Sequence, residues 1–91
     1  MCTMAKGSII SCQITYFPIG SRQYLEEIDE VLELIKNSGL DYNVDILSTT
    51  IKGEADKVFD LITNIHKEMS YKNCNYTMNV MVSNICGCGL E

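Results

Sequence analysis

The hydrophobic pattern of this chain switches between a period of two and a period of three to four residues, and this switching limits the folds open to it. Three segments alternate between apolar and polar side chains: residues 8–17, 42–47 and 76–83. Two segments carry apolar stripes at helical spacing: residues 22–38 and 54–70. Alternation is typical of half-buried strands, and the longer period is typical of amphipathic helices. With a short strand predicted at residues 50–52, the order of elements is βαββαβ.

Residues that favour turns and caps lie at the boundaries of these elements. Pro18 and Gly20 should end the first strand, because proline cannot continue a ladder and glycine permits the turn. Ser21 is a suitable N-cap for the first helix, and Gly39 a suitable stop for it. Gly53 should end the short third strand before the second helix begins.

The order βαββαβ predicts a ferredoxin-like α+β fold, in which a four-stranded antiparallel sheet carries two helices on one face. We expect the 91 residues to form a single domain, residues 1–91. The other face of the sheet should present mainly hydroxyl and amide groups with one methionine: Ser11, Gln13, Thr15, Thr77, Asn79, Met81 and Ser83. We expect this open face to pack on a partner, most simply a second copy, giving a homodimer or a dimer of dimers.

Charge and cysteine usage narrow the class of protein. The formal net charge is −5 and Arg22 is the only arginine, which argues against binding to nucleic acid or to an anionic membrane surface. No apolar run approaches the roughly 20 residues that span a bilayer, and the first residues lack the apolar core of a secretory signal. The five cysteines have neither zinc-ribbon nor disulfide-framework spacing. Reduced thiols in the cytoplasm are therefore expected.

The sequence offers little for catalysis, so we expect a protein that is not an enzyme and needs no cofactor. The acidic residues of the first helix should cover its solvent face, where nothing raises a carboxyl pKa. His66 has no cysteine or second histidine at metal-ligand spacing, and we expect it to pack at the helix end or to be exposed. The pair Cys86 and Cys88 leaves an alternative open: a metal or redox protein, with Cys12 and Cys74 joining them. A regulatory domain that only assembles with another protein is a further alternative.

One cluster of residues predicts a ligand cavity. Ser48, Thr49 and Thr50 stand together where the second and third strands meet, and Thr49 should face the helices. A hydroxyl on that side needs a partner or a ligand. Cys12 and Tyr16 share this side on the first strand, which is the neighbour of the third strand in this topology. Together these residues could enclose a mostly apolar cavity with a few polar points, as in small-ligand sites.

Several segments also carry a family resemblance: residues 11–19 (SCQITYFPI), 48–53 (STTIKG) and 58–60 (VFD), followed by Ser83 and Cys86. On these segments the chain resembles the YkoF-like thiamine/hydroxymethylpyrimidine-binding family. It departs at Gln13, where the family pattern has a basic residue, and after Cys86, where proline-glycine is expected.

The resemblance implies a protein that binds the aminopyrimidine part of thiamine, or a related pyrimidine, without converting it, in uptake or handling of the vitamin. Family members often carry two such domains in tandem, so a homodimer of this single domain would restore the pair. The ligand-binding residues expected on this basis are Cys12, Gln13, Tyr16, Asp45, Ser48, Thr49 and Ser83. Hydroxyls can either donate to or accept from the pyrimidine. Asp45 either faces the positive thiazolium ring or is simply a solvated strand residue.

Overall fold

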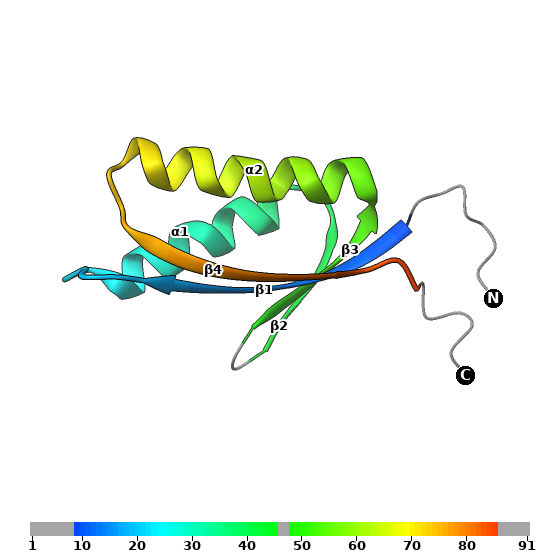
Figure 1. Cartoon of the computed structure of the whole chain (residues 1–91), viewed down its shortest axis with the longest axis horizontal. Helices are drawn as coiled ribbons and strands as arrows, with labels where there is room; N and C mark the ends of the chain where they lie inside the picture. The colour runs from blue at the N-terminus through cyan, green and yellow to red at the C-terminus, as the bar shows by residue number, and fades with distance from the viewer. Residues whose placement is uncertain (1–8, 46–47, 86–91) are drawn as a thin grey trace.

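A computed structural model of the protein describes residues 9–45 and 48–85 and shows a four-stranded sheet with two helices over one face (Figure 1). Its elements are β1 (Ile9–Pro18), α1 (Tyr24–Asn37), β2 (Asp41–Val44), β3 (Thr49–Glu54), α2 (Ala55–Tyr71) and β4 (Tyr76–Ser83). The sheet is antiparallel in the order β2-β3-β1-β4. This arrangement confirms the predicted ferredoxin-like α+β fold.

The hydrophobic core lies between the sheet and the two helices. Its buried side chains come from alternate positions of the central strands and from the inner stripes of both helices: Ile10, Cys12, Ile14, Val31, Ile35, Ile51, Val58, Leu61, Ile65 and Met69. Cys12 pairs with Ile51 across the two central strands, and Ile14 pairs with Thr49. The predicted inward side of the central strands is therefore correct, and Thr49 is buried with it at 7% exposure.

Two of the predicted caps and stops differ from the structure. Ser21 does not cap α1, which begins at Tyr24; the Ser21 hydroxyl instead accepts a hydrogen bond from the Gln23 backbone at 3.0 Å and closes a turn before the helix. Gly53 does not end the third strand, because β3 continues through Glu54. A Cβ atom at Gly53 would lie 2.4 Å from Cδ2 of Leu40, so the glycine makes room for Leu40 to pack on the strand. The predicted stop at Gly39 is confirmed by its φ of +82°.

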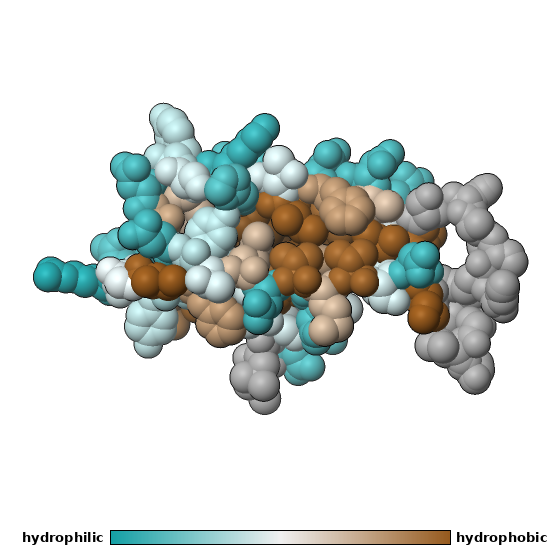
Figure 2. All heavy atoms as spheres, in the orientation of Figure 1, coloured by the Kyte–Doolittle hydropathy of each residue, from teal (hydrophilic) through white to brown (hydrophobic). Residues whose placement is uncertain are grey.

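The outer strand β4 is only partly covered by the helices, which lie mainly over β1 and β3. Val80 and Val82 pair with Ile14 and Cys12 and so point to the helix side, yet they are 38% and 40% exposed. Figure 2 shows apolar surface gathered in the strip between α2 and β4. Neither of the two helices in the described part of the chain has the length and apolar character needed to cross a bilayer.

Candidate functional site

A cavity of about 150 Å³ lies between α1 and the corner where β2 leads into β3. The central strand contributes Ile14, Thr15 and Tyr16, the helix contributes Ile28, Val31, Leu32 and Ile35, and the corner contributes Val44, Asp45, Ser48 and Thr49. The helix wall is therefore apolar, and the polar groups come from the strands. A mostly apolar hollow with a few directed polar groups is the usual form of a small-molecule site.

Four of the seven predicted site residues meet on the wall of this cavity: Tyr16, Asp45, Ser48 and Thr49. The backbone N–H of Asp45 donates to the carbonyl oxygen of Ser48 at 2.8 Å, which closes the corner and fixes its shape. Gln13 does not line the cavity, but its Nε2 donates to the Ser48 hydroxyl at 3.1 Å. Gln13 therefore orients a wall residue from the opposite face of the sheet.

The other two predicted residues lie away from the cavity. Cys12 is 1% exposed and sits in the core opposite Ile51, where burial raises the pKa of its thiol. Ser83 pairs with Ser11, near the start of β1, and lies on the open face of the sheet. The described residues hold no group of three histidine, cysteine or acidic side chains that could bind a metal ion. Cys86 and Cys88, on which the metal or redox alternative depends, lie outside the described residues.

One residue of the cavity wall, Tyr16, has a buried hydroxyl without a hydrogen-bond partner within the described part of the chain. Burial raises the pKa of Tyr16 to about 12, with further contributions from Glu27, Cys74 and Tyr76. Tyr16 thus keeps its proton at neutral pH and is available as a donor. Buried polar groups are nearly always paired in folded proteins, so an unpaired hydroxyl calls for an explanation.

Sequence reasoning placed Glu27 on the solvent face of the first helix, and this prediction is wrong. Glu27 is only partly exposed, and its Oε1 is buried without a hydrogen-bond partner among the described residues. Its position explains the burial, because Glu27, Val31 and Ile35 follow one another at four-residue spacing and share the inner stripe of α1. That spacing was the signal in the sequence that could have found it.

The ring of Tyr16 is one of a stacked aromatic pair. The rings of Tyr16 and Tyr76 are 5.0 Å apart between centroids, and the Tyr76 hydroxyl is hydrogen-bonded to Nδ1 of His66. His66 is exposed near the end of α2, as expected, and orients Tyr76. In contrast to Tyr16, Tyr76 therefore has its hydroxyl satisfied within the fold.

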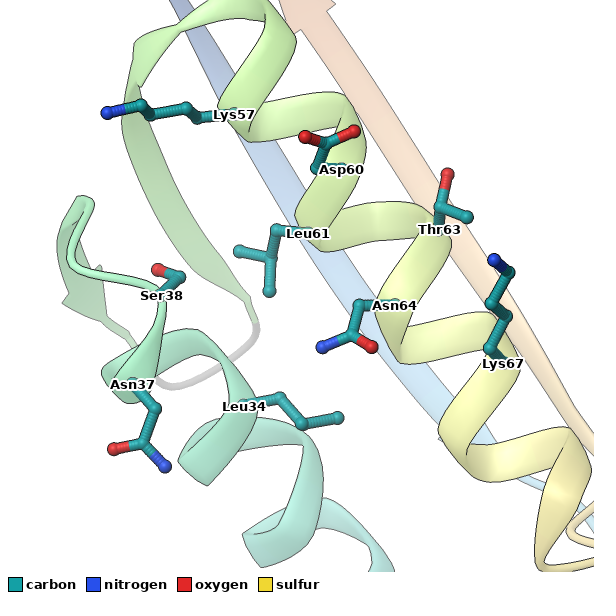
Figure 3. Close-up of a pocket in the computed structure, with 9 residues that line it drawn as sticks. All are labelled: Leu34, Asn37, Ser38, Lys57, Asp60, Leu61, Thr63, Asn64 and Lys67. Carbon is teal, nitrogen blue, oxygen red and sulfur yellow. The ribbon is translucent and has the colours of Figure 1, made fainter.

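A larger hollow of about 510 Å³ lies on the outside of the molecule, between the end of α1 and α2 (Figure 3). Leu34, Leu61 and Asn64 point into the space between the helices. This hollow contains none of the predicted site residues. Its size reflects a shallow surface groove between two helices, so we assign the candidate site to the smaller, better enclosed cavity.

Comparison with known proteins places the chain in a family. Its sequence matches the model of the YKOF-related family over residues 9–88, and no curated protein matches it. Solved structures with the same fold include a proposed thiamine biosynthesis/salvage protein from Thermotoga maritima (TM-score 0.72, 21% identity, covering 82% of each chain). A domain of unknown function from Bacillus cereus is also similar (TM-score 0.78, 17% identity, covering 96% of this chain and 86% of that one). Because the family match spans most of the sequence, this chain belongs to the YKOF-related family, as the resemblance predicted.

Proposed function

We propose that this protein binds the aminopyrimidine ring of thiamine, or the free hydroxymethylpyrimidine, and serves uptake or handling of the vitamin without catalysing a reaction. The observation that carries this proposal is the cavity of about 150 Å³ on whose wall four of the predicted ligand residues meet. An apolar cavity of roughly 150 Å³ is large enough for a benzene ring. The pyrimidine would therefore fill the cavity, and the thiazolium of thiamine would extend outside it.

The walls suit a flat ring with polar edges. Val31 and Leu32 provide apolar contact for the ring faces, while Ser48 and Thr49 can donate to or accept from ring nitrogens and the amino group. These groups hold and orient a ring, which is the basis for proposing recognition rather than conversion. The similarity to the thiamine-related protein of Thermotoga maritima supports the ligand class.

Calorimetric titration with thiamine and with hydroxymethylpyrimidine tests the proposal. We expect saturable binding of at least one of them, and Thr49→Val should weaken it about three- to tenfold, because it removes one hydrogen bond worth roughly 0.5–1.5 kcal/mol. Thr77→Val is the matched control, since Thr77 is exposed on β4 and pairs with Phe17, away from the cavity. Absence of heat with both compounds at high concentration would refute the proposal.

The open face of the sheet supports self-association as part of this proposal. Phe17 and Met81 lie on that face and are 46% and 67% exposed. A second copy covering them would hide apolar surface and bring two sites into one particle, as the tandem domains of the family do. The face lies opposite the helices, so this contact would leave the cavity between α1 and the sheet accessible.

A further inference from the structure

The outer strand β4 has a free edge that lacks the usual protection against pairing. Within the described part of the chain, β4 is hydrogen-bonded to β1 alone, so its other edge carries unpaired backbone groups. Edge strands of natural proteins are commonly short, bulged, or interrupted by proline or charged residues, which prevents their association with other strands. β4 is eight residues long and contains neither proline nor a charged residue (YTMNVMVS). The opposite edge strand β2, by contrast, has four residues and begins at Asp41.

The register of β4 on β1 determines which of its backbone groups point to the free edge. The Ile19 N–H donates to the Asn75 carbonyl oxygen at 2.9 Å, which makes these two residues a hydrogen-bonded pair. Hydrogen-bonded and non-hydrogen-bonded pairs alternate along an antiparallel ladder, so the next pair, Pro18 with Tyr76, is non-hydrogen-bonded. The same alternation continues along the strand. The N–H and carbonyl groups of every second residue therefore point outward: Tyr76, Met78, Val80 and Val82.

An apolar strip runs beside this edge on the helix side of the sheet. The hydrogen bond between His66 and Tyr76 shows which side of α2 faces β4. Phe59 and Ile62 share that side of α2 by their helical spacing from His66, and Phe59 is 50% exposed. Together with Val80 and Val82 they form the apolar strip, which lies where Figure 2 shows apolar surface between α2 and β4.

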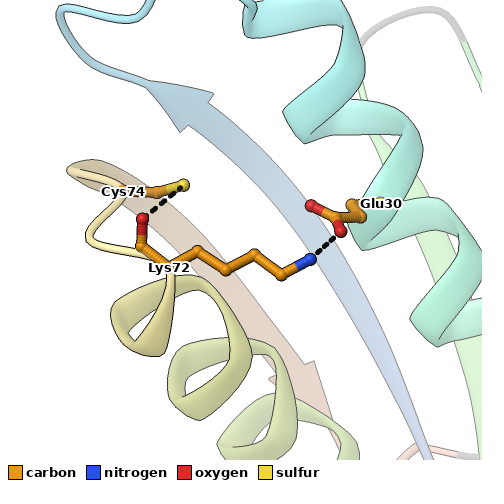
Figure 4. A network of polar contacts seen from close by, with 3 residues as sticks. All are labelled: Glu30, Lys72 and Cys74. Carbon is orange, nitrogen blue, oxygen red and sulfur yellow. Dashed lines mark hydrogen bonds and ion pairs between the residues drawn. The ribbon is translucent and has the colours of Figure 1, made fainter.

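Charged side chains of the helices lie on the other side of α2. Lys57, Asp60 and Lys67 line the hollow between α2 and α1. Lys72, which follows α2, reaches across to α1 and is ion-paired with Glu30 (Figure 4). Apolar surface that is left free of charge beside an open sheet edge is typical of an interaction site.

We propose that a second copy of this chain pairs with the free edge of β4 in antiparallel orientation. A twofold axis beside Asn79 would place Met78 opposite the second copy's Val80, and would join two four-stranded sheets into one of eight strands. Such an axis is perpendicular to the sheet, so both helix layers lie on the same side and the apolar strips of the two copies meet. Each chain carries a formal net charge of −5, and an uncharged surface lets two copies approach with the least repulsion.

This contact is separate from the one proposed for the open face, because it uses the edge of the sheet and the helix side of β4. A sheet edge with one flanking helix presents less area than a whole sheet face. The edge contact would therefore be the weaker one and would join open-face dimers at higher protein concentration, giving a closed dimer of dimers. The cavity lies at the corner of β2 and β3, on the other side of the sheet, and stays open.

Amide hydrogen exchange, measured by NMR at low and at high protein concentration, tests the proposal. The amides of Asn79 and Met81, which bond to β1, should be protected at both concentrations. Those of Met78 and Val80 should exchange at least tenfold more slowly at the high concentration, because pairing with another strand covers them. Association through the open face alone, or no association, would leave the exchange of Met78 and Val80 independent of concentration, and either result would overturn the proposal.

A charged variant ties this protection to the apolar strip. Val80→Lys places a lysine next to the twofold axis in both copies, where the like charges oppose pairing. The concentration-dependent protection of Met78 should be lost in this variant. It should be retained in Tyr71→Lys, which adds the same charge at an 87% exposed residue half a turn around α2 from Ile62.

Protection of Met78 that persists in Val80→Lys would show that the strip takes no part in the contact, and would overturn the proposal. Thermal unfolding verifies that Val80→Lys is folded. If it is not, the comparison of wild type at the two concentrations decides alone, since it needs no substitution.

Discussion

Removing the Tyr16 hydroxyl should stabilise the free protein, an unusual result for a change at a packed aromatic residue. Tyr16→Phe keeps the ring, its stacking on Tyr76 and its apolar contacts, and deletes only a buried oxygen that has no partner among the described residues. Mutational data give roughly 1–3 kcal/mol as the cost of such an unpaired group. We expect a gain of about 1 kcal/mol in the free energy of unfolding, at the lower end of that range. For a domain of this size, that corresponds to a rise of about 4–8 °C in Tm.

The partner ring provides the matched control. Tyr76→Phe makes the same chemical change in the other half of the stack, but it deletes a hydroxyl that is hydrogen-bonded to His66. The net value of such a bond is roughly 0.5–1.5 kcal/mol, so this variant should lose stability. Urea denaturation of both variants measures the two changes, and the expected result is that they have opposite signs.

Tyr16→Phe should also change how the free energy of unfolding depends on pH at alkaline pH. The folded-state pKa of Tyr16 is raised to about 12 from an ordinary value of 10.0, so ionisation favours the unfolded chain. This contribution to stability is complete below pH 10 and is lost as the pH rises towards 12. Tyr16→Phe should therefore lose less stability than wild type between pH 10 and 12. A Tyr16→Phe protein less stable than wild type by 1 kcal/mol or more at neutral pH would show that the hydroxyl has a partner, and would refute the reasoning.

Two further predictions concern the core and the open face. Ile65 is 0% exposed in the core, so Ile65→Ala should lower the free energy of unfolding by roughly 2–5 kcal/mol, measured by urea denaturation; a loss under 1 kcal/mol would contradict the packing described for α2. Met81→Lys should shift the protein from dimer towards monomer in light scattering, because it places a charge on the face proposed to meet a second copy; a wild type that is already monomeric at high concentration would contradict that proposal.

The order of elements could be predicted from the sequence because alternation and helical stripes are local properties. Alternation also assigned faces correctly, as the burial of Cys12 and Thr49 on one side of the sheet shows. It could not say where along the strands the cavity lies. That depends on the register, which sets Thr49 opposite Ile14 and Cys12 opposite Ile51. The cavity formed at the first of these pairs, which is why Cys12 shares a face with the site without lining it.

Glu27 shows a different limit of sequence reasoning. Its neighbours Glu26, Asp29 and Glu30 are also acidic, and an acidic run on a helix is usually a solvated face. Only the tertiary placement of Tyr16 and Cys74 beside α1 shows that Glu27 belongs to the inner stripe. The four-residue spacing from Glu27 to Val31 and Ile35 indicated an inward position. The acidic composition of the surrounding run favoured a solvated face, and the prediction followed the composition. A polar residue at a core position is a local inconsistency, and such inconsistencies concentrate at functional sites.

The unpaired groups around the cavity bear on the choice between a ligand-binding protein and a domain that only assembles. Tyr16 and Glu27 each hold a buried atom that has no hydrogen-bond partner among the described residues and costs stability in the free protein. A small domain has a free energy of unfolding of only about 5–15 kcal/mol, so these unpaired groups lower it by a measurable fraction. Assembly through the open face would not relieve this cost, because that face lies on the other side of the sheet. Tyr16 lines the cavity, so a ligand there could pair with its hydroxyl after a rotation of the side chain. The binding hypothesis therefore gives this hydroxyl a role that the assembly hypothesis does not.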